Sequence, residues 1–142
     1  MTGPSRSHMH AEFEPVAAVL RDYFEGLYRS DTQILRRVFH PSALYACATD
    51  GSLLALGMDA YFPVVDKRPS PASRGEARAD SIISIEFAGP VTALARVECA
   101  ILPKRFTDLL TLVKLDGRWQ IIAKVFHYEL EGAVSGPQNN PR

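Results

Sequence analysis

Cysteine is scarce in this sequence. Among 142 residues there are two, Cys47 and Cys99, and they are far apart. They form no C-x-x-C motif, and none of the four histidines has ligand spacing with a cysteine or carboxylate on a shared element. These absences argue against a zinc site, and we expect no metal and no cofactor. Both cysteines lie in apolar runs, which favours buried free thiols in a reducing, cytoplasmic compartment.

Net charge is also missing. Lysine plus arginine equals aspartate plus glutamate, 16 of each, so the formal charge is zero. A neutral chain has no overall attraction for nucleic acid or an anionic membrane, and we expect neither as a partner. No stretch approaches 18 apolar residues, so no membrane span is expected. Residues 1–10 lack the apolar core of a secretory signal.

Hydrophobic residues make up 46% of the chain, enough for a packed globule. A chain of this length suits one domain, and a domain of this size buries roughly 68–70% of the surface of its unfolded chain. We place a single domain at residues 12–130. The segments 1–11 and 131–142 are expected to be flexible tails, the second because it is rich in Gly, Pro, Asn and Ser.

The first helix is predicted to begin at Glu14 and Pro15, since proline suits a first helical position. An apolar stripe at helical spacing follows: Val16, Leu20, Tyr23 and Leu27. Tyr23 lies on that stripe, so its hydroxyl must find a partner in the core or at a cavity mouth. Gly26 within the helix indicates close packing there, because glycine costs about 1 kcal/mol relative to alanine in a helix.

A second, short helix is expected after Ser30. Ser30 with Gln33 fits a capping box, and Pro41 favours a stop just before it.

The rest of the chain is predicted to be mostly strand. Strands are expected at 43–49, 52–56, 83–87, 91–102, 105–115 and 118–128, with a short helix at 58–66 that contains Pro63. Asp50-Gly51 and Asp116-Gly117 are hairpin signals. Strands joined this tightly are antiparallel neighbours, so the order of elements predicts an α+β fold with helices on one face of a curved antiparallel sheet.

Between that helix and the later strands lies a Pro- and Ser-rich loop. It carries a modest basic cluster of Arg68, Arg74 and Arg78, which we interpret as solvated loop charge.

The last strand is apolar on both faces. Strict alternation places Trp119, Ile121, Val125 and His127 on one face, and Ile122, Phe126 and Tyr128 on the other. An antiparallel sheet with one face in water should alternate more cleanly. Helices can cover one face only, and a second subunit is the simplest cover for the other, so we expect a homodimer.

Several segments resemble the nuclear transport factor 2-like superfamily, over roughly residues 12–129. They are residues 20–31, Phe39-His40-Pro41, residues 107–114, Asp116-Gly117-Arg118-Trp119 and Lys124-Val125-Phe126-His127. The resemblance is closest to the branch called putative lumazine-binding, with ketosteroid isomerase and SnoaL-like cyclases as more distant relatives. It implies a cone-shaped (cystatin-like) fold: a strongly bent sheet around helices, a pocket at the wide end, and dimerisation through the outer sheet face. "Lumazine-binding" is a family label, and nothing in the sequence indicates a pterin site.

The resemblance also implies site residues. The helix tyrosine of ketosteroid isomerase, an oxyanion hydrogen-bond donor, matches Tyr23, and its strand carboxylic acid matches Asp108, which stands in an apolar run that disfavours its charged form. The position of the general base falls near Cys47, which is a departure, because a thiol is no obvious substitute for a carboxylate. His127 is the histidine best placed to act as base instead.

Three functional hypotheses follow. The leading one is a small-molecule-binding domain, without established catalysis, that takes a small, partly apolar organic ligand. The alternative is a lyase or isomerase acting on a carbonyl compound, with Tyr23 and Asp108 as oxyanion donors and His127 as base. The third is an interaction module with a vestigial pocket, in which each of these residues is merely structural. The predicted pocket lining is Tyr23, Leu27, Phe39, Tyr45, Phe62, Asp108 and His127.

Overall fold

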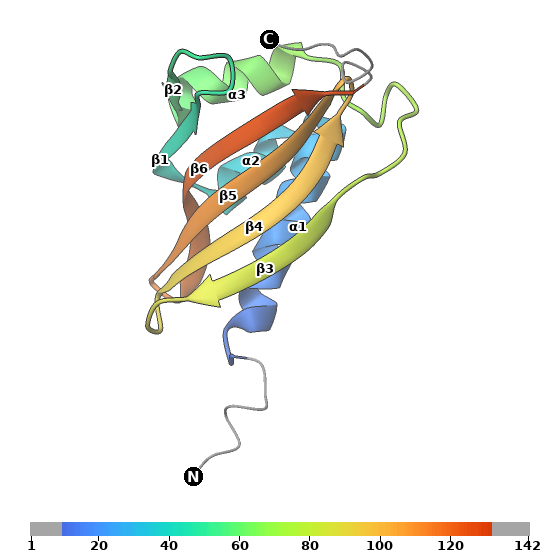
Figure 1. The fold of residues 1–142 in the computed structure, drawn as a ribbon. Coiled ribbons are helices and arrows are strands. Elements are labelled where there is room, and N and C mark those ends of the chain that lie inside the picture. Colours follow the sequence, from blue (N-terminus) through green and yellow to red (C-terminus); the bar gives the residue numbers. More distant parts are fainter. Residues whose placement is uncertain (1–9, 132–142) are drawn as a thin grey trace.

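The computed structural model describes residues 10–131, in which three helices pack against one six-stranded sheet (Figure 1). The elements are α1 (Phe13–Arg29), α2 (Thr32–Val38), β1 (Phe39–Cys47), β2 (Leu54–Gly57), α3 (Met58–Lys67), β3 (Ser81–Phe87), β4 (Thr92–Ile101), β5 (Lys104–Leu115) and β6 (Arg118–Leu130). The predicted α+β class is confirmed. The calls on 1–9 and 132–142 lie outside the described residues.

The sheet runs in the order β2-β1-β6-β5-β4-β3. Strands β3 to β6 form the expected antiparallel meander, and β1 pairs with β6 in parallel. The tight turn at Asp116-Gly117 is confirmed, because both residues have positive φ, 52° and 75°. The hairpin predicted at Asp50-Gly51 is confirmed, since β1 and β2 pair antiparallel, but its loop is longer than two residues: β1 ends at Cys47 and β2 begins only at Leu54. Asp50 instead accepts hydrogen bonds from Ser52 within that longer loop.

The junction between α1 and α2 corrects one cap. Asp31, not Ser30, is the N-cap of α2, and its carboxylate accepts hydrogen bonds from the N–H groups of Gln33 and Ile34. Ser30 ends α1 in the left-handed conformation, with φ 49°. The close packing expected at Gly26 is confirmed, since a Cβ placed there would lie 2.6 Å from Leu35 Cδ2.

The set of alternate residues of β6 that faces the core changes along the strand. Its register with β5 shifts between Thr111 and Leu112, opposite Ile121 to Ala123. Trp119 and Ile121 are buried before the shift, whereas Lys124 and Phe126 are buried after it. The expectation that His127 shares a face with Trp119 is therefore wrong, because a β-bulge moves the inward side chains by one residue.

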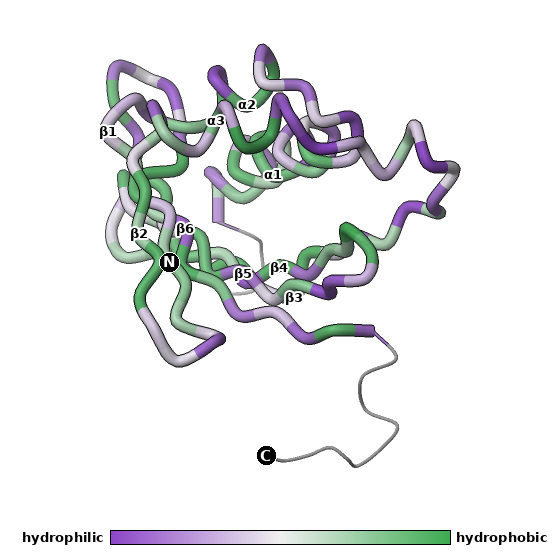
Figure 2. The backbone as a smooth tube through the Cα atoms, turned by 90° about the horizontal axis from the view of Figure 1, so that it is seen from above, coloured by the Kyte–Doolittle hydropathy of each residue, from purple (hydrophilic) through white to green (hydrophobic). Residues whose placement is uncertain are grey.

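The helices cover one face of β3 to β6, as the view from above shows (Figure 2). The core lies between them and contains Leu20, Leu35, Leu110 and Leu112, all fully buried. Within residues 10–131 nothing covers the opposite face of the sheet, which exposes Leu94, Leu109 and Val125.

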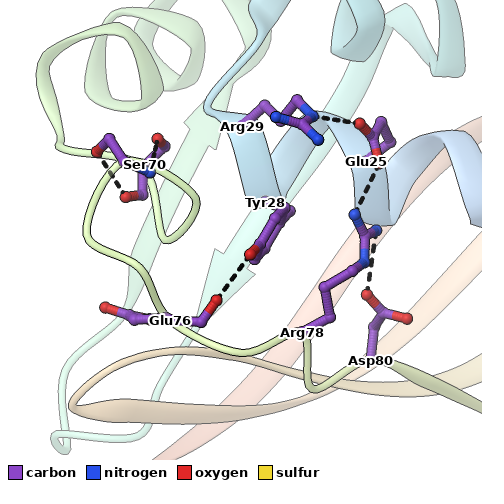
Figure 3. A network of polar contacts seen from close by, with 8 residues as sticks. Glu25, Tyr28, Arg29, Ser70, Glu76, Arg78 and Asp80 are labelled. Atoms are coloured by element: carbon purple, nitrogen blue, oxygen red, sulfur yellow. Dashed lines mark hydrogen bonds and ion pairs between the residues drawn. The ribbon is translucent and has the colours of Figure 1, made fainter.

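A polar network holds the loop between α3 and β3 against α1 (Figure 3). The Arg78 guanidinium lies 2.8 Å from Glu25 Oε1, and the Tyr28 hydroxyl donates to the carbonyl of Glu76 at 2.7 Å. The Glu76 carboxylate in turn pairs with Arg74 and accepts from the N–H of Leu102. The loop is thus tied both to α1 and to the β4–β5 turn, at the end of the fold where the pocket described below opens.

Candidate functional site

Tyr23 and Asp108 form a buried polar pair between α1 and β5. Tyr23 lies on the apolar stripe of α1, and Asp108 lies on the inward parity of β5, opposite Phe126. The Tyr23 hydroxyl donates to Asp108 Oδ2 at 2.5 Å, and both residues are completely buried. Burial, followed by the charge of Asp108, raises the pKa of Tyr23, so the phenol stays protonated as a donor. The two residues that sequence reasoning singled out are therefore brought together.

Lys124 is a buried cation beside this pair, and sequence reasoning did not select it. It faces inward from β6 and retains 4% exposure. Its ammonium lies 5.2 Å from the ring centroids of Tyr23 and Phe126, 5.3 Å from that of Tyr45 and 5.5 Å from that of Tyr61. Such a cage attracts a cation electrostatically. The only sequence signal was a lysine between apolar residues of the last strand.

The charge of Lys124 is set by opposing effects. Burial lowers the pKa of its ammonium, but the oxygens of Tyr61 and Tyr45 and the Asp108 carboxylate outweigh burial and hold the pKa above its usual range. Among residues 10–131, no carboxylate lies within ion-pair distance of the Lys124 ammonium. Lys124 thus presents a positive charge whose donors are available.

Two oxygen atoms of the cluster have no hydrogen-bond partner in the described part of the chain: Asp108 Oδ1 and the Tyr61 hydroxyl. Buried polar atoms normally form hydrogen bonds, so buried atoms without one indicate a site where a hydrogen-bond partner is missing. Cys99 borders the pair, with Sγ 4.0 Å from Asp108 Oδ2. Burial and then the Asp108 charge raise the pKa of Cys99 to about 12, so this thiol is unreactive near neutral pH.

A pocket of about 460 Å³ adjoins the cluster. Its lining comes from β1, the following loop, β2, α3 and the near ends of β4 to β6: Tyr45, Cys47, Asp50, Leu54, Val64, Arg68, Ile101, Leu102, Pro103, Lys104, Phe106, Phe126 and Tyr128. Tyr45 and Phe126 line the pocket and also contact the Lys124 ammonium, and Tyr45 stacks on Tyr61 with centroids 4.3 Å apart. A larger hollow of about 580 Å³ is lined by Cys99, Phe106 and His127 and by several charged side chains of β4 to β6 and of the loop before β3. We take the smaller pocket as the site because it shares two side chains with the cluster.

The other predicted lining residues are distributed differently. Phe39 and Phe62 are core residues, packed edge-on with centroids 6.3 Å apart. Leu27 borders only a void of about 10 Å³ beneath Cys99. Tyr45 lines the pocket. Cys47, which was not among the predicted lining residues, lines it as well.

His127 lies away from the Tyr23–Asp108 pair. Its side chain is 58% exposed on the outer face of β6, beside Glu129. Its Nδ1 is 3.1 Å from Thr49 Oγ1, and Thr49 in turn accepts a hydrogen bond from the Cys47 thiol at 3.3 Å. Because the β-bulge in β6 turns His127 to the outer face, it does not share a reaction centre with Tyr23 and Asp108.

Within residues 10–131, His, Cys, Asp and Glu side chains do not gather in threes or more that could hold a metal ion. None of the helices described is both long and apolar enough to cross a membrane.

Comparisons with known proteins agree with this architecture. A curated relative, "Aldolase FrzH" from Cladobotryum sp, is 29% identical over 119 residues, covering 82% of this chain and 91% of the relative. An NTF2-like protein of unknown function from Shewanella baltica superposes with a TM-score of 0.75 at 27% identity, covering 91% of this chain and 98% of that one. A ketosteroid isomerase-like protein from Erwinia carotovora atroseptica, 14% identical, shares the fold with a TM-score of 0.66 and covers 84% of this chain and 98% of its own.

The family model described as "Putative lumazine-binding" matches residues 11–127, which is most of the described chain. The predicted resemblance is confirmed. The chain belongs to the putative lumazine-binding family, within the nuclear transport factor 2-like superfamily.

Proposed function

We propose that this protein binds a small, enolisable carbonyl compound in the 460 Å³ pocket and catalyses bond changes next to that carbonyl, as an isomerase or an aldol-type lyase. The observation that carries the proposal is the buried cluster of Tyr23, Asp108 and Lys124 beside that pocket. A buried ammonium and a buried carboxylate with a free oxygen atom are the two groups that enolisation needs.

Lys124 takes the role of oxyanion stabiliser. Its raised pKa keeps the amine protonated, which suits it to stabilise a developing enolate and not to attack the carbonyl as a free amine. In a site with little water, such a charge is worth more than in solution. Tyr45 and Phe126 lie between the pocket and the ammonium, so the Tyr45 ring must rotate aside for a ligand oxygen to reach it.

Asp108 takes the role of general base. Tyr23 occupies Oδ2 as a donor, which holds the carboxylate in place, while the buried Oδ1 has no hydrogen-bond partner among residues 10–131. Asp108 Oδ1 accepts the α-proton, and the electrons of the C–H bond form the enolate, whose oxygen faces Lys124. This assignment replaces the one expected from the sequence, in which Tyr23 and Asp108 both donated and His127 was the base.

The enolate can then react in two ways, and in both the proton held by Asp108 is returned. If Asp108 returns the proton to a different carbon of the conjugated system, the net reaction is an isomerisation. If the enolate carbon attacks a second carbonyl carbon, the new alkoxide takes the proton from Asp108, and the net reaction is an aldol addition, whose reverse is a lyase reaction. The name of the curated relative, an aldolase, supports this class of chemistry.

The test is exchange of α-hydrogen for deuterium, followed by proton NMR in D₂O, over a panel of small ketones and keto acids. We expect the protein to accelerate exchange for at least one compound. The variants Asp108→Asn and Lys124→Met should each reduce that rate by about 10²-fold or more. Lys67→Met is the matched control, because Lys67 is exposed and absent from the pocket lining.

Exchange that persists in both Asp108→Asn and Lys124→Met would refute the assigned roles. If compounds bind but none exchanges faster than in buffer, the protein is a small-molecule-binding domain without this catalysis, which is the leading hypothesis from the sequence.

A further inference from the structure

The three arginines of the loop after α3 have different surroundings. Arg74 pairs with Glu76. Arg78 pairs with Glu25 and Asp80 (Figure 3). Arg68, in contrast, lines the 460 Å³ pocket, and its Nε is buried without a hydrogen-bond partner among residues 10–131. The sequence-based interpretation as solvated loop charge therefore does not describe Arg68, since a buried unsatisfied donor is costly unless a partner completes it.

Lys104 supplies a second cation to the same pocket from the start of β5. Its ammonium lies 4.4 Å from the centroid of the Tyr128 ring, another pocket residue. No ion pair joins Lys104 or Arg68 to an acid in the part of the chain that the structure describes. The acid in the lining, Asp50, turns its Oδ1 to the N–H and hydroxyl of Ser52.

The remaining walls are apolar and aromatic. Phe106, Phe126 and Tyr128 form one ring cluster, with the Phe106 centroid 5.7 Å from that of Phe126 and 6.1 Å from that of Tyr128. The pocket thus combines unpaired cations, a ring-lined wall and, behind Tyr45, the Lys124 ammonium.

We propose that the ligand of this pocket is a carboxylic acid, whose carboxylate is bound by Arg68 and Lys104 while its apolar body packs on the aromatic wall. Combined with the proposed function, on which this step rests, the proposal identifies the substrate as a keto acid whose carbonyl is directed to Lys124. A guanidinium suits this task, because its fork matches the two oxygen atoms of a carboxylate. A charged anchor also fixes which end of the molecule reaches the reacting groups.

The test compares 3-benzoylpropionate with its methyl ester by isothermal titration calorimetry. The two compounds share the phenyl ring and the ketone and differ in the negative charge. We expect the acid to bind at least about tenfold more tightly than the ester, because only the acid can accept charge-assisted hydrogen bonds from Arg68 and Lys104. This advantage should shrink as salt concentration rises.

Variants locate the effect. Arg68→Gln should bring the acid to the affinity of the ester, Arg68→Lys should keep part of the preference, and Lys104→Gln should reduce it. Lys67→Gln, the exposed neighbour of Arg68, should leave it unchanged. Circular dichroism of each variant establishes that it is folded.

Equal binding of acid and ester, no binding of either compound, or an acid preference that survives Arg68→Gln would each overturn the inference. The proposed function fails separately. If the acid binds in an Arg68-dependent way but α-hydrogen exchange is absent for every keto acid tested, the anion site stands and the catalysis does not.

Discussion

Tyr23 and Tyr61 are both fully buried tyrosines of the core, yet their hydroxyl groups differ. The Tyr23 hydroxyl donates to Asp108, whereas that of Tyr61 has no partner among the residues described. A hydroxyl with a buried carboxylate partner stabilises the fold, whereas an unsatisfied one does not. The pair therefore offers a matched comparison at the scale of single atoms.

We predict that Tyr23→Phe lowers the free energy of unfolding by about 1–3 kcal/mol, because it leaves the buried Asp108 carboxylate without its donor. Tyr61→Phe, which removes an unsatisfied hydroxyl, should be neutral or slightly stabilising. Urea unfolding followed by circular dichroism measures both. Equal decreases in the free energy of unfolding of the two variants would show that the Tyr23–Asp108 hydrogen bond does not stabilise the fold.

At the scale of elements, the packing of α1 on α2 depends on the absence of a side chain. A Cβ on Gly26 would lie 2.6 Å from Cδ2 and 2.8 Å from Cγ of Leu35, which is itself fully buried. Helix propensity favours alanine by about 1 kcal/mol, but overpacking a core costs about 1–3 kcal/mol. The steric effect should prevail.

We predict that Gly26→Ala destabilises the protein by about 1 kcal/mol, the difference between those two effects. In a Leu35→Ala background, where the clashing atoms are gone, the same substitution should instead stabilise the helix. Chemical denaturation of the four proteins in this cycle gives the sign. A stabilising effect of Gly26→Ala in both backgrounds would contradict the packing argument.

A second contact between elements fastens the start of α1 to the β5–β6 hairpin. The Glu12 carboxylate accepts hydrogen bonds from the Lys114 ammonium and from the Trp119 indole N–H, each at 2.8 Å. The bond from Lys114, followed by that from Trp119, lowers the pKa of Glu12. A carboxyl group with a lowered folded-state pKa stabilises the fold above its unfolded-state pKa, and that contribution is lost as the pH falls through the folded value.

We predict a change in tryptophan emission as the pH falls below about 4.5, the ordinary value for glutamate, since Trp119 is the single tryptophan of the chain. Glu12→Gln should remove that transition, because the group no longer titrates. Glu14→Gln is the control, as Glu14 pairs only with the exposed Arg21 in the described region. A transition of the same size in Glu12→Gln would assign it to another group.

At the scale of the whole molecule, the outer face of the sheet is unusually apolar. Leu94, Leu109 and Val125 are 39%, 43% and 47% exposed there. A hollow of about 270 Å³ on this face is lined by Leu109 and Val125 together with Arg96, Thr107, Phe126 and His127. Large apolar side chains exposed on one face and flanked by polar residues are typical of protein–protein interfaces. The chain also has zero net charge, which does little to oppose association.

We predict a homodimer formed through this outer face. Leu109→Lys should shift the protein toward a monomer in sedimentation-velocity experiments, because the new charge would be buried in the interface. Leu53→Lys, on the exposed loop between β1 and β2, should leave the oligomeric state unchanged. A wild-type protein that stays monomeric at high concentration would contradict the prediction.

The sequence by itself determined the α+β class, the strand meander, the Gly26 contact and the two partners Tyr23 and Asp108. Those inferences rest on local periodicity, on turn residues and on resemblance to a family. The helical stripe places Tyr23 inward without knowledge of any distant contact. Asp108 was selected as a carboxylate within an apolar run and through the family resemblance.

The tertiary structure alone decided what surrounds that pair. A β-bulge reverses the parity of β6, which brings Lys124 inward and leaves His127 outside. The tertiary structure also places Arg68 in the pocket with Lys104, whereas Arg74 and Arg78 of the same loop form ion pairs. These placements depend on register and on contacts between residues far apart in the chain, and a one-residue shift in register exchanges the faces of every side chain beyond it.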